Sequence, residues 1–348
     1  MATIRDVAKH AGVSVATVSR VINSPDKVSE ETCRRVQQSI EALGFEPDFL
    51  ARTWRTRETR TIAAVMSDNT SPHHGVTLRE AAVIALAHDY NLLLCTTFFD
   101  PEIERRYLRM LRMRKVDGIL LNNASDCKDE IAKFAEMQVP VVLLNRPLGD
   151  YGPMVDAVVV DSYRGSFDLV EHLIQTGHQR IGLVYSAALH KFHQHERLRG
   201  YCDALSAHGI PYDESLVRSI PIGRSFRLPL APNTLAFPTR PTALYAAGYG
   251  TGLAVMTLVR EQGLRVPQDI AFAMFDDVMW GEFVNPPLTL VRNPGETLGR
   301  VAMELIFARM ADRQRPPQEV RLQPALIVRR SCGCPSGLPG SSTPAASI

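Results

Sequence analysis

Residues 6–23 read DVAKHAGVSVATVSRVIN. The apolar residues of this stretch recur at helical spacing on both sides of Gly12, which permits a sharp turn between two short helices. Thr3 and Asp6 are spaced as a capping box for the first helix. Ser14 is placed to cap the second. The stretch therefore predicts two short helices joined by a tight turn.

The second predicted helix has distinct inward and outward faces. Val18 and Val21 turn inward. The outward positions are Ser14, Val15, Ala16, Thr17, Ser19 and Arg20. A third helix, from Ser29 to a stop at Gly44, completes a unit of about 45 residues. This pattern predicts a helix-turn-helix whose second helix enters a DNA major groove, and a generic small helical bundle fits the same periodicity.

The run 6–23 closely resembles the lactose/galactose repressor family of bacterial transcription regulators, and the resemblance continues to about residue 331. The DNA-contacting positions that it implies, together with the two helix starts, are Thr3, Ser14, Val15, Ala16, Thr17, Ser19, Arg20 and Asn23. Val15 and Ala16 carry no hydrogen-bonding side-chain groups, so Arg20 is expected to provide most of the polar base readout.

The resemblance also implies a hinge helix at residues 47–55, which is too short to be helical alone in water. It is expected to fold only beside its dimer mate on DNA. Its expected DNA contacts are Leu50, Ala51, Arg52, Trp54 and Arg55. Trp54 stands where family members usually carry a leucine wedge, so insertion into the minor groove and packing on the core domain are both open. Four arginines against one acid in residues 52–60 suit a polyanion or a solvated basic linker.

From residue 61 onward, short apolar runs alternate with helical stretches. The expected strands are residues 61–66, 91–95, 118–121, 141–144, 157–160, 181–184, 243–246 and 270–274. Continuous apolar runs indicate strands buried on both faces, as in a parallel, doubly wound α/β sheet. The resemblance implies a periplasmic-binding-protein-like domain of two parallel-sheet subdomains. The expected division is a helix-turn-helix domain at 1–46, a hinge and linker at 47–60, an effector-binding and dimerisation domain at 61–331, and a disordered tail at 332–348.

The resemblance implies that a small effector lies between the subdomains, against residues that follow the strands. The matching positions are Asn69, His73, His74, Asn145, Arg146, Lys191, His193, Arg197, Tyr249 and Asp276. Their cationic balance favours an anionic effector, such as a sugar acid or phosphorylated sugar, unless the histidines near residue 193 lie on a solvated loop. Tyr249 replaces a usual acid, and Pro229 and Pro232 interrupt a normally helical segment. A regulator whose cleft has lost its effector is therefore a further alternative.

An enzyme is the less favoured function. Residues 248–252 read Gly-Tyr-Gly-Thr-Gly after a predicted strand, but the third glycine is misplaced for a dinucleotide-binding loop. Cys332 and Cys334 supply two of the four ligands that a metal site usually has, so we interpret them as bystanders. No metal or cofactor is expected.

The composition agrees with a globular regulator. The chain has 348 residues, 45% of them hydrophobic, with a net charge of +2 and six cysteines in no disulfide-like spacing. No apolar run approaches the roughly 20 residues of a membrane span, and no signal sequence precedes the first helix. We therefore expect a cytoplasmic homodimeric repressor with two partners, a double-stranded DNA operator and a small carbohydrate-derived effector, and no membrane association.

Overall fold

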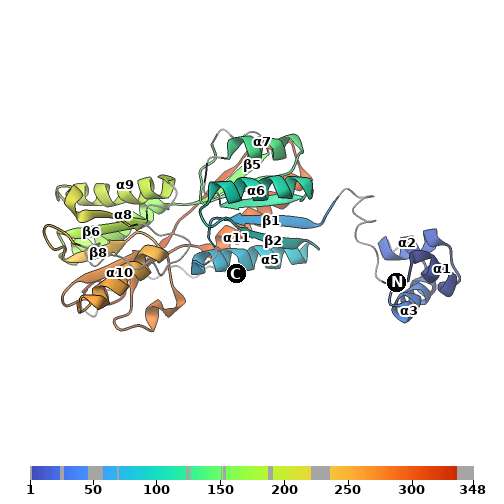
Figure 1. Ribbon diagram of the computed structural model, residues 1–348, viewed down its shortest axis with the longest axis horizontal. Coiled ribbons are helices and arrows are strands. Elements are labelled where there is room, and N and C mark those ends of the chain that lie inside the picture. The colour runs from blue at the N-terminus through green and yellow to red at the C-terminus, as the bar shows by residue number, and fades with distance from the viewer. Residues whose placement is uncertain are drawn as a thin grey trace. The chain divides into compact units, whose positions relative to one another are not determined.

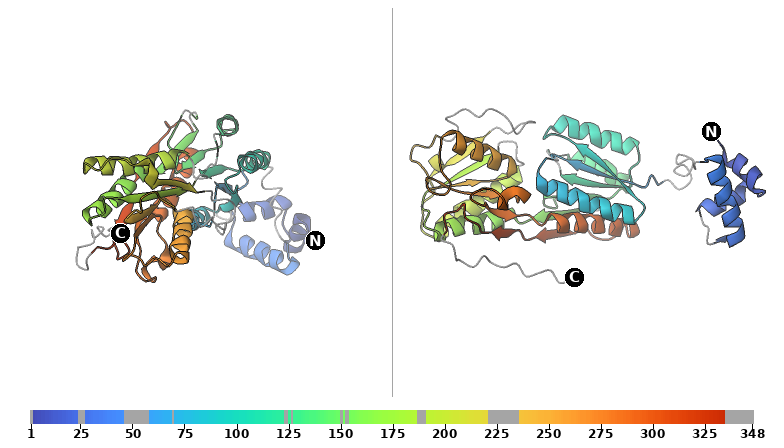
Figure 2. Two further views of the ribbon diagram at one scale, coloured as in Figure 1. Left: turned by 60° about the vertical axis from the view of Figure 1, so that its left-hand side comes forward. Right: turned by 90° about the horizontal axis from the view of Figure 1, so that it is seen from below.

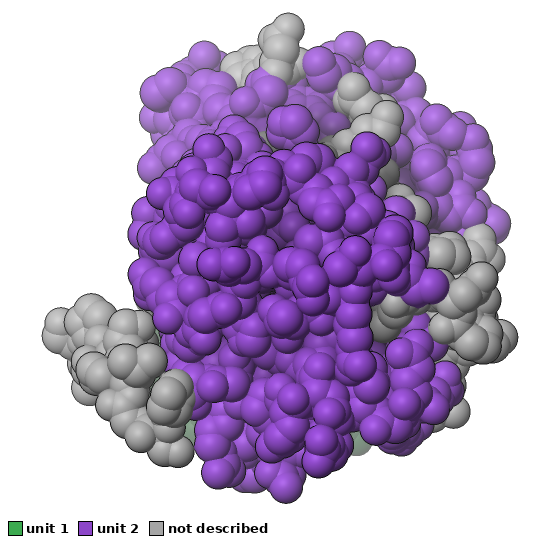
Figure 3. Space-filling model, turned by 90° about the vertical axis from the view of Figure 1, so that its left-hand side faces the viewer, with its two compact units in different colours: residues 1–59 green, residues 60–348 purple. Residues whose placement is uncertain are grey.

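The computed structural model describes residues 2–23, 27–45, 58–68, 70–122, 125, 127–149, 151, 154–186, 191–220 and 236–334. The chain forms two compact units, Met1–Thr59 and Arg60–Ile348, which are coloured separately in Figure 3. The expected hinge helix and residues 335–348 lie outside the described residues, as do Pro229 and Pro232. Within the described part, no helix combines the length and apolarity of a membrane span.

The first unit consists of three helices, α1 (Ile4–Ala11), α2 (Val15–Asn23) and α3 (Glu30–Leu43). The capping box is present, because Thr3 Oγ1 accepts from the Asp6 amide and the Thr3 amide donates to the Asp6 carboxylate. Gly12 and Gly44 end α1 and α3 with left-handed φ angles of 62° and 56°. The small core is formed by Val7, Ala8, Ala11, Val18, Val21, Val36 and Phe45.

The second unit contains two six-stranded sheets (Figure 1). The first has the order β11-β5-β4-β3-β1-β2 and is parallel throughout. Its strands are β1 (Thr61–Met66), β2 (Asn91–Thr96), β3 (Gly118–Asn122), β4 (Val141–Leu144), β5 (Val155–Val160) and β11 (Glu319–Leu322). Helices α5 (Pro72–Ala87) and α11 (Gly295–Ala311) cover one face, and α6 (Pro101–Met113) and α7 (Lys128–Glu136) cover the other.

The second sheet has the order β12-β10-β9-β8-β6-β7. Its strands are β6 (Ile181–Ser186), β7 (Val217–Ile220), β8 (Ala243–Ala246), β9 (Ala271–Phe275), β10 (Thr289–Arg292) and β12 (Ala325–Ile327). Helices α8 (Ser162–Gln175) and α9 (Lys191–Ala207) lie on one face and α10 (Tyr249–Glu261) on the other. Two short 3₁₀ helices, η2 (Glu214–Leu216) and η3 (Met279–Glu282), complete the elements.

All eight expected strands are present, and the two-subdomain α/β fold is confirmed. Four strands were not expected: β7, β10, β11 and β12. One of them departs from the parallel pattern, because β12 pairs antiparallel with β10. The expected tail also begins too early at residue 332, since Cys332 is fully buried in the core of the second sheet.

The chain passes between the two sheets three times: from β5 to α8, from β10 to α11, and from β11 to β12 (Figures 1 and 2). Both sheets therefore belong to one unit that is built from interleaved parts of the sequence. The loops that follow β1, β4, β8 and β9 supply the polar residues described below. Ligands of open α/β sheets bind at this carboxyl edge of the strands.

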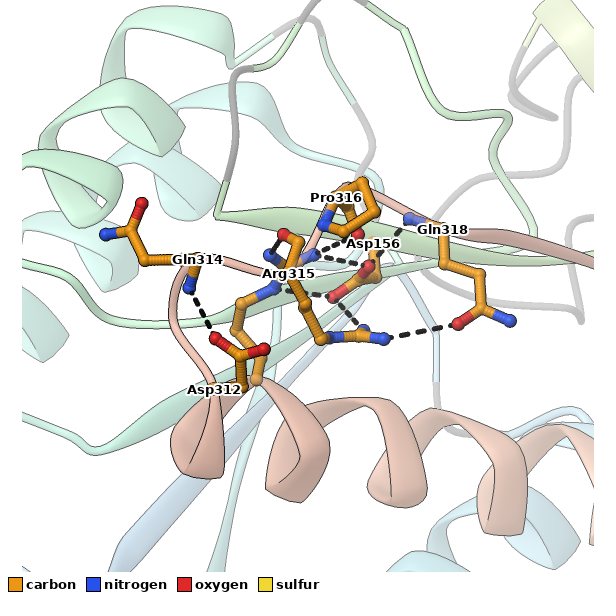
Figure 4. A network of polar contacts seen from close by, with 7 residues as sticks. Asp156, Asp312, Gln314, Arg315, Pro316 and Gln318 are labelled. Atoms are coloured by element: carbon orange, nitrogen blue, oxygen red, sulfur yellow. Dashed lines mark hydrogen bonds and ion pairs between the residues drawn. The ribbon is translucent and has the colours of Figure 1, made fainter.

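A buried ionic network fixes the last return of the chain to the first sheet (Figure 4). Asp156 on β5 and Arg309 on α11 have no exposed side-chain surface, and they form two hydrogen bonds of 2.7 and 3.1 Å. Arg315 adds an ion pair of 2.7 Å to Asp156, and the Gln318 amide donates to the same carboxylate at 2.8 Å. The network joins β5, α11 and the segment that leads into β11.

Candidate functional site

The exposed face of α2 is the first candidate site. Val18 is fully buried, whereas Val15 is 41% exposed and Ala16 and Arg20 are exposed. The Ser14 hydroxyl accepts from the Thr17 amide at 3.1 Å and lies 2.8 Å from the Thr17 hydroxyl. The turn at Gly12 and the small core thus present one side of a rigid helix to solvent.

The other positions expected to contact DNA are described to different extents. Thr3 is the N-cap of α1, and Ser19 is half-buried on α2. Asn23 is the last residue of α2, and the structure does not describe its side chain. The expected hinge contacts lie outside the described residues: Leu50, Ala51, Arg52, Trp54 and Arg55. Their DNA-binding roles remain predictions.

The second candidate site is a polar cluster between the two sheets of the larger unit. Its centre is Arg197 on α9, which is 7% exposed and packs over the Phe275 ring at 3.8 Å from the ring centroid. One guanidinium nitrogen donates to the Ala247 carbonyl at 2.6 Å. Another lies 3.9 Å from Asp276 Oδ1, so the charges of Arg197 and Asp276 face each other in a buried place.

Asp276 follows β9 and has a left-handed φ of 79°, a strained conformation for a non-glycine residue. Its Oδ2 accepts from the Tyr249 amide at 3.0 Å, and its Oδ1 accepts from Asn293 Nδ2 at 2.5 Å. Burial is the largest single influence and raises the pKa of the Asp276 carboxyl, but the Arg197 charge, the neighbouring histidines and the Tyr249 amide together outweigh it, so the net pKa lies below its ordinary value. The carboxylate is therefore ionised and balances Arg197.

The first sheet contributes His73 and Asn145 to the same cluster. His73 lies in the first turn of α5, and its Nε2 is 3.4 Å from Asn145 Nδ2. Burial, together with the nearby His74, lowers the pKa of His73 to about 3. His73 is therefore a neutral imidazole at physiological pH.

Three buried polar atoms of this cluster have no hydrogen-bond partner among the described residues: His73 Nδ1, Arg197 Nε and Asn293 Oδ1. An unpaired buried polar group is costly, so such atoms commonly mark a place that a ligand or water fills. A pocket of about 340 Å³ is lined by two of these three residues, His73 and Asn293. Its volume falls in the lower range of small-molecule sites, about 300–1,000 Å³.

The remaining expected effector residues do not all join the cluster. Arg146 donates to the Ser125 carbonyl at 2.6 Å and lies over the Tyr151 ring. His74 Nδ1 is 2.7 Å from the Asp68 carbonyl. Tyr249 contributes its backbone amide, as described above. Asn69 and the side chains of Lys191 and His193 are outside the description, although residues 191 and 193 belong to α9.

Two residues of the cluster were not expected from the sequence. Asn293 follows β10, and the largely apolar run before it, Leu-Thr-Leu-Val at residues 288–291, is the signal that could have identified both the strand and the residue. Phe275 is the last residue of β9, and no sequence pattern indicates that it stacks on Arg197.

The start of α10 also bears on the dinucleotide alternative. A dinucleotide site needs free amides at a helix N-terminus to bind phosphate. Here the first amide of α10, on Tyr249, is bonded to the Asp276 carboxylate. Gly252 lies against Met274, since a Cβ there would approach the methionine side chain to 2.8 Å, so this glycine serves helix-strand packing.

Comparisons with known proteins agree with this geometry. A family model for bacterial regulatory proteins of the lacI family matches residues 3–48, and one for a periplasmic binding protein-like domain matches residues 170–332. The HTH-type transcriptional repressor PurR of Mannheimia succiniciproducens is 30% identical over 334 residues, which cover 95% of this chain and 98% of that protein.

Solved structures show the same architecture. A transcriptional regulator CelR-cellobiose complex has 31% identity and a TM-score of 0.68, over 95% of this chain and 100% of that one. The lac repressor dimer bound to operator and an anti-inducer has a TM-score of 0.79 at 24% identity, over 95% and 99% of the two chains, and supports the fold alone. An exposed helix-turn-helix, a polar cluster between two sheets and full-length similarity to a repressor all agree: the chain belongs to the lacI family of bacterial regulatory proteins.

Proposed function

We propose that this regulator is a repressor that reads double-stranded operator DNA with α2 and is controlled by a small effector bound between its two sheets. The observation that carries the proposal is the two-faced α2, which buries Val18 and Val21 and exposes Val15, Ala16 and Arg20. A helix of this kind inserts into the major groove, where arginine pairs with guanine and apolar groups meet thymine methyls. A protein of this function acts where the chromosome is, in the cytoplasm.

The DNA-binding part is tested with two arginines in different roles. Arg20→Ala should relax the preference for operator over random DNA, because it removes polar base readout. Arg52→Ala, in the expected hinge, should weaken binding to all sequences alike and flatten the salt dependence. Arg34→Ala on α3, where Arg34 pairs weakly with Glu30, is the matched control and should leave the preference intact. Equal losses for Arg20→Ala and Arg52→Ala on every sequence would contradict these roles.

The effector proposed for the cleft is a neutral, hydroxyl-rich molecule such as a sugar. Among the described cleft residues, the charge of Arg197 is balanced by Asp276, and His73 is neutral. The excess of positive charge expected from the sequence is thus reduced, so a sugar acid or phosphorylated sugar is less favoured as the effector. A guanidinium beside a carboxylate offers both donors and acceptors to hydroxyl groups. The cellobiose complex of the relative CelR also supports a sugar.

Thermal unfolding separates this proposal from its alternatives. Ligand binding to the native state raises the midpoint, so a neutral sugar should raise it more than an acidic or phosphorylated sugar. A rise with acidic sugars alone would restore the anionic effector. No rise with any sugar, combined with specific DNA binding, would indicate a regulator without an effector. A rise with a dinucleotide and no DNA binding would indicate an enzyme.

The functional assembly is proposed to be a homodimer on a near-palindromic operator. The lac repressor, whose fold this chain shares, is a dimer on its operator. Two copies of α2 would then read two half-sites. The effector would control DNA affinity by changing the relative position of the two sheets, and through it the order of the two hinge segments.

A further inference from the structure

Three side chains of types that bind metals lie close together beside the second sheet. One comes from α8 and two come from the last described residues of the chain. The ligand atoms of His172, Cys332 and Cys334 all lie within 4.8 Å of one another. His172 Nε2 is 3.2 Å from the Cys332 sulfur, although 160 positions separate the two residues in the sequence. None of the three belongs to the polar cluster between the two sheets.

The segment that carries the cysteines is held firmly. The Ser331 hydroxyl donates to the Phe272 carbonyl at 2.6 Å and accepts from the Thr289 amide at 2.8 Å. A ring nitrogen of His178 lies 3.0 Å from the Cys332 carbonyl. The position of the fully buried Cys332 is therefore fixed by the sheet and by the loop after α8.

Gly333 turns the chain so that the second sulfur returns to the first. Its φ of +80° is in the left-handed region, which glycine adopts without strain. As a result, the sulfurs of Cys332 and Cys334 lie on the same side and approach the same atom, the Arg329 carbonyl oxygen, at 3.2 and 3.1 Å. The imidazole of His172 faces this pair from α8.

We propose that His172, Cys332 and Cys334 form a binding site for a zinc-like divalent ion. Thiolates and imidazole are the ligands that zinc selects, and atoms less than 5 Å apart can surround one ion at bond lengths of about 2.0–2.3 Å. Three protein ligands leave one tetrahedral position for water or a solute. Cys334 also lines the groove of about 820 Å³ between Val266–Pro267 and Arg330, which gives this open position access to solvent.

A disulfide between Cys332 and Cys334 is the competing chemistry of a Cys-Gly-Cys segment. His172 distinguishes the two possibilities. A metal site requires a further ligand such as this imidazole, 3.2 Å from the Cys332 sulfur, whereas a disulfide does not. The ion would join the segment 332–334 to α8, the helix that packs against the Arg197-bearing α9.

The test uses the full-length, fully reduced protein. Zinc uptake is titrated in competition with a chromophoric chelator, and Co²⁺ is used separately as a spectroscopic probe. We expect one Zn²⁺ per chain, and a Co²⁺ spectrum with sulfur-to-cobalt charge transfer and tetrahedral d–d bands. His172→Ala and Cys334→Ser should each weaken zinc binding by at least about 100-fold. Cys202→Ser is the matched control: this half-buried cysteine lies on α9, outside the cluster, and its loss should change nothing.

Several outcomes would overturn the proposal. One is equal zinc affinity in the wild type and in His172→Ala. Another is the absence of thiolate charge transfer with Co²⁺. A third is oxidation of the metal-free protein to a species two hydrogens lighter, with a Cys332–Cys334 disulfide and no zinc uptake by the reduced form. Because Cys332 is fully buried and its replacement can unfold the protein, the two partly exposed ligands carry the test, with circular dichroism as the check on folding.

Discussion

Asp276 is the residue that holds the polar cluster between the two sheets together. Its carboxylate faces the Arg197 guanidinium, accepts from the Asn293 side chain and accepts from the first amide of α10. These groups come from α9, from the loop after β10 and from α10. A ligand that forms hydrogen bonds with the unpaired atoms of Arg197 and Asn293 would therefore be coupled, through Asp276, to the positions of three elements.

Asp276→Asn is expected to weaken effector binding by at least about 30-fold, or about 2 kcal/mol, because it leaves the buried Arg197 charge without its partner. Isothermal titration with the sugar identified by thermal shift measures this loss. Asp269→Asn is the matched control. Asp269 precedes β9, at the opposite end of the same strand, and also pairs with an arginine, Arg265, but on the surface. If both variants bound the sugar alike, the assigned role of Asp276 would be wrong.

His73 makes the stability of the protein depend on pH. Burial and the charge of His74 lower its pKa from 6.5 to about 3, while Asp276 acts in the opposite direction and Arg197 in the same one. The unfolded chain takes up a proton below about pH 6.5, whereas the folded chain does not until about pH 3. Stability from the neutral ring is therefore fully present above pH 6.5 and falls as the pH drops from 6.5 toward 3.

His73→Gln should remove this part of the pH dependence. Between pH 7.5 and pH 5, the free energy of unfolding of the wild type should fall by about 2 kcal/mol more than that of the variant, since 1.5 pH units below 6.5 correspond to about 2 kcal/mol. Urea unfolding at the two pH values gives the comparison. Parallel losses in the two proteins would show that His73 is protonated in the folded state.

The residues of the cleft illustrate what a single sequence can predict. Arg197, Asp276, His73 and Asn145 were expected in the cleft and do meet there. Arg146 was expected on the same grounds, but its long side chain reaches back to the Ser125 carbonyl. The position of a residue after a strand is visible in sequence, whereas the direction of its side chain depends on partners that only the fold supplies.

Two pairs of helices are packed so closely that a glycine is required at each contact. A Cβ on Gly200 of α9 would lie 2.4 Å from the Tyr163 carbonyl oxygen of α8, and one on Gly299 of α11 would lie 2.4 Å from the Thr77 carbonyl oxygen of α5. Backbone atoms cannot move aside as side chains can. The α8–α9 contact also supports Arg197, whose carbonyl accepts from Ser166 of α8 at 2.7 Å.

Gly200→Ala should destabilise the protein by about 1–3 kcal/mol through overpacking, and it should weaken effector binding because α9 must shift with Arg197. Gly75→Ala is the matched control, since Gly75 is an exposed helical glycine on α5 with no atom within 4 Å of its added Cβ. That variant should be unchanged or more stable by up to about 1 kcal/mol. Chemical denaturation measures both, and equal stability of the two variants would argue against the close contact.

Three of the four strands that the sequence does not predict share a physical reason, whereas the fourth, β10, is a central strand with a polar residue, Thr289, in its apolar run. β7, β11 and β12 are edge strands of their sheets, and edge strands need not be apolar on both faces. β11 alternates polar and apolar residues over only four positions, and β7 has two polar residues between two apolar ones, so neither gives a clear pattern. Central strands with uninterrupted apolar runs are predicted because they are buried on both sides, as the four fully buried residues of β4 show.

The proposed homodimer needs a surface on the whole molecule for its second copy. Apolar side chains are exposed on neighbouring elements of the first sheet: Val83 and Leu86 of α5 are 58% and 74% exposed, and Leu94 of the edge strand β2 is 44% exposed. Exposed apolar groups that lie together indicate an interaction surface. Met113 is 76% exposed but belongs to α6, on the opposite face of the sheet.

Leu86→Glu should weaken dimerisation by at least about tenfold, because it places a charge in an apolar contact. Sedimentation equilibrium at several concentrations measures the change, and Met113→Glu serves as the matched control that should leave the dimer intact. DNA affinity should fall together with dimerisation in Leu86→Glu, and it should be unchanged in Met113→Glu. A wild type that is monomeric at the concentrations where it binds operator would contradict the dimer.

In the function proposed for this chain, the N-terminal unit binds a specific duplex and the effector-binding unit controls that binding. Fluorescence anisotropy with genomic DNA fragments and excess random competitor at moderate salt, with and without a neutral sugar that raises the thermal midpoint, tests it most directly. We predict that at least one fragment binds in preference to the competitor, that Arg20→Ala abolishes this preference, and that the sugar changes the wild-type affinity but not that of Asp276→Asn. Binding that shows no preference for any fragment, and no response to the sugar, would contradict an effector-controlled repressor.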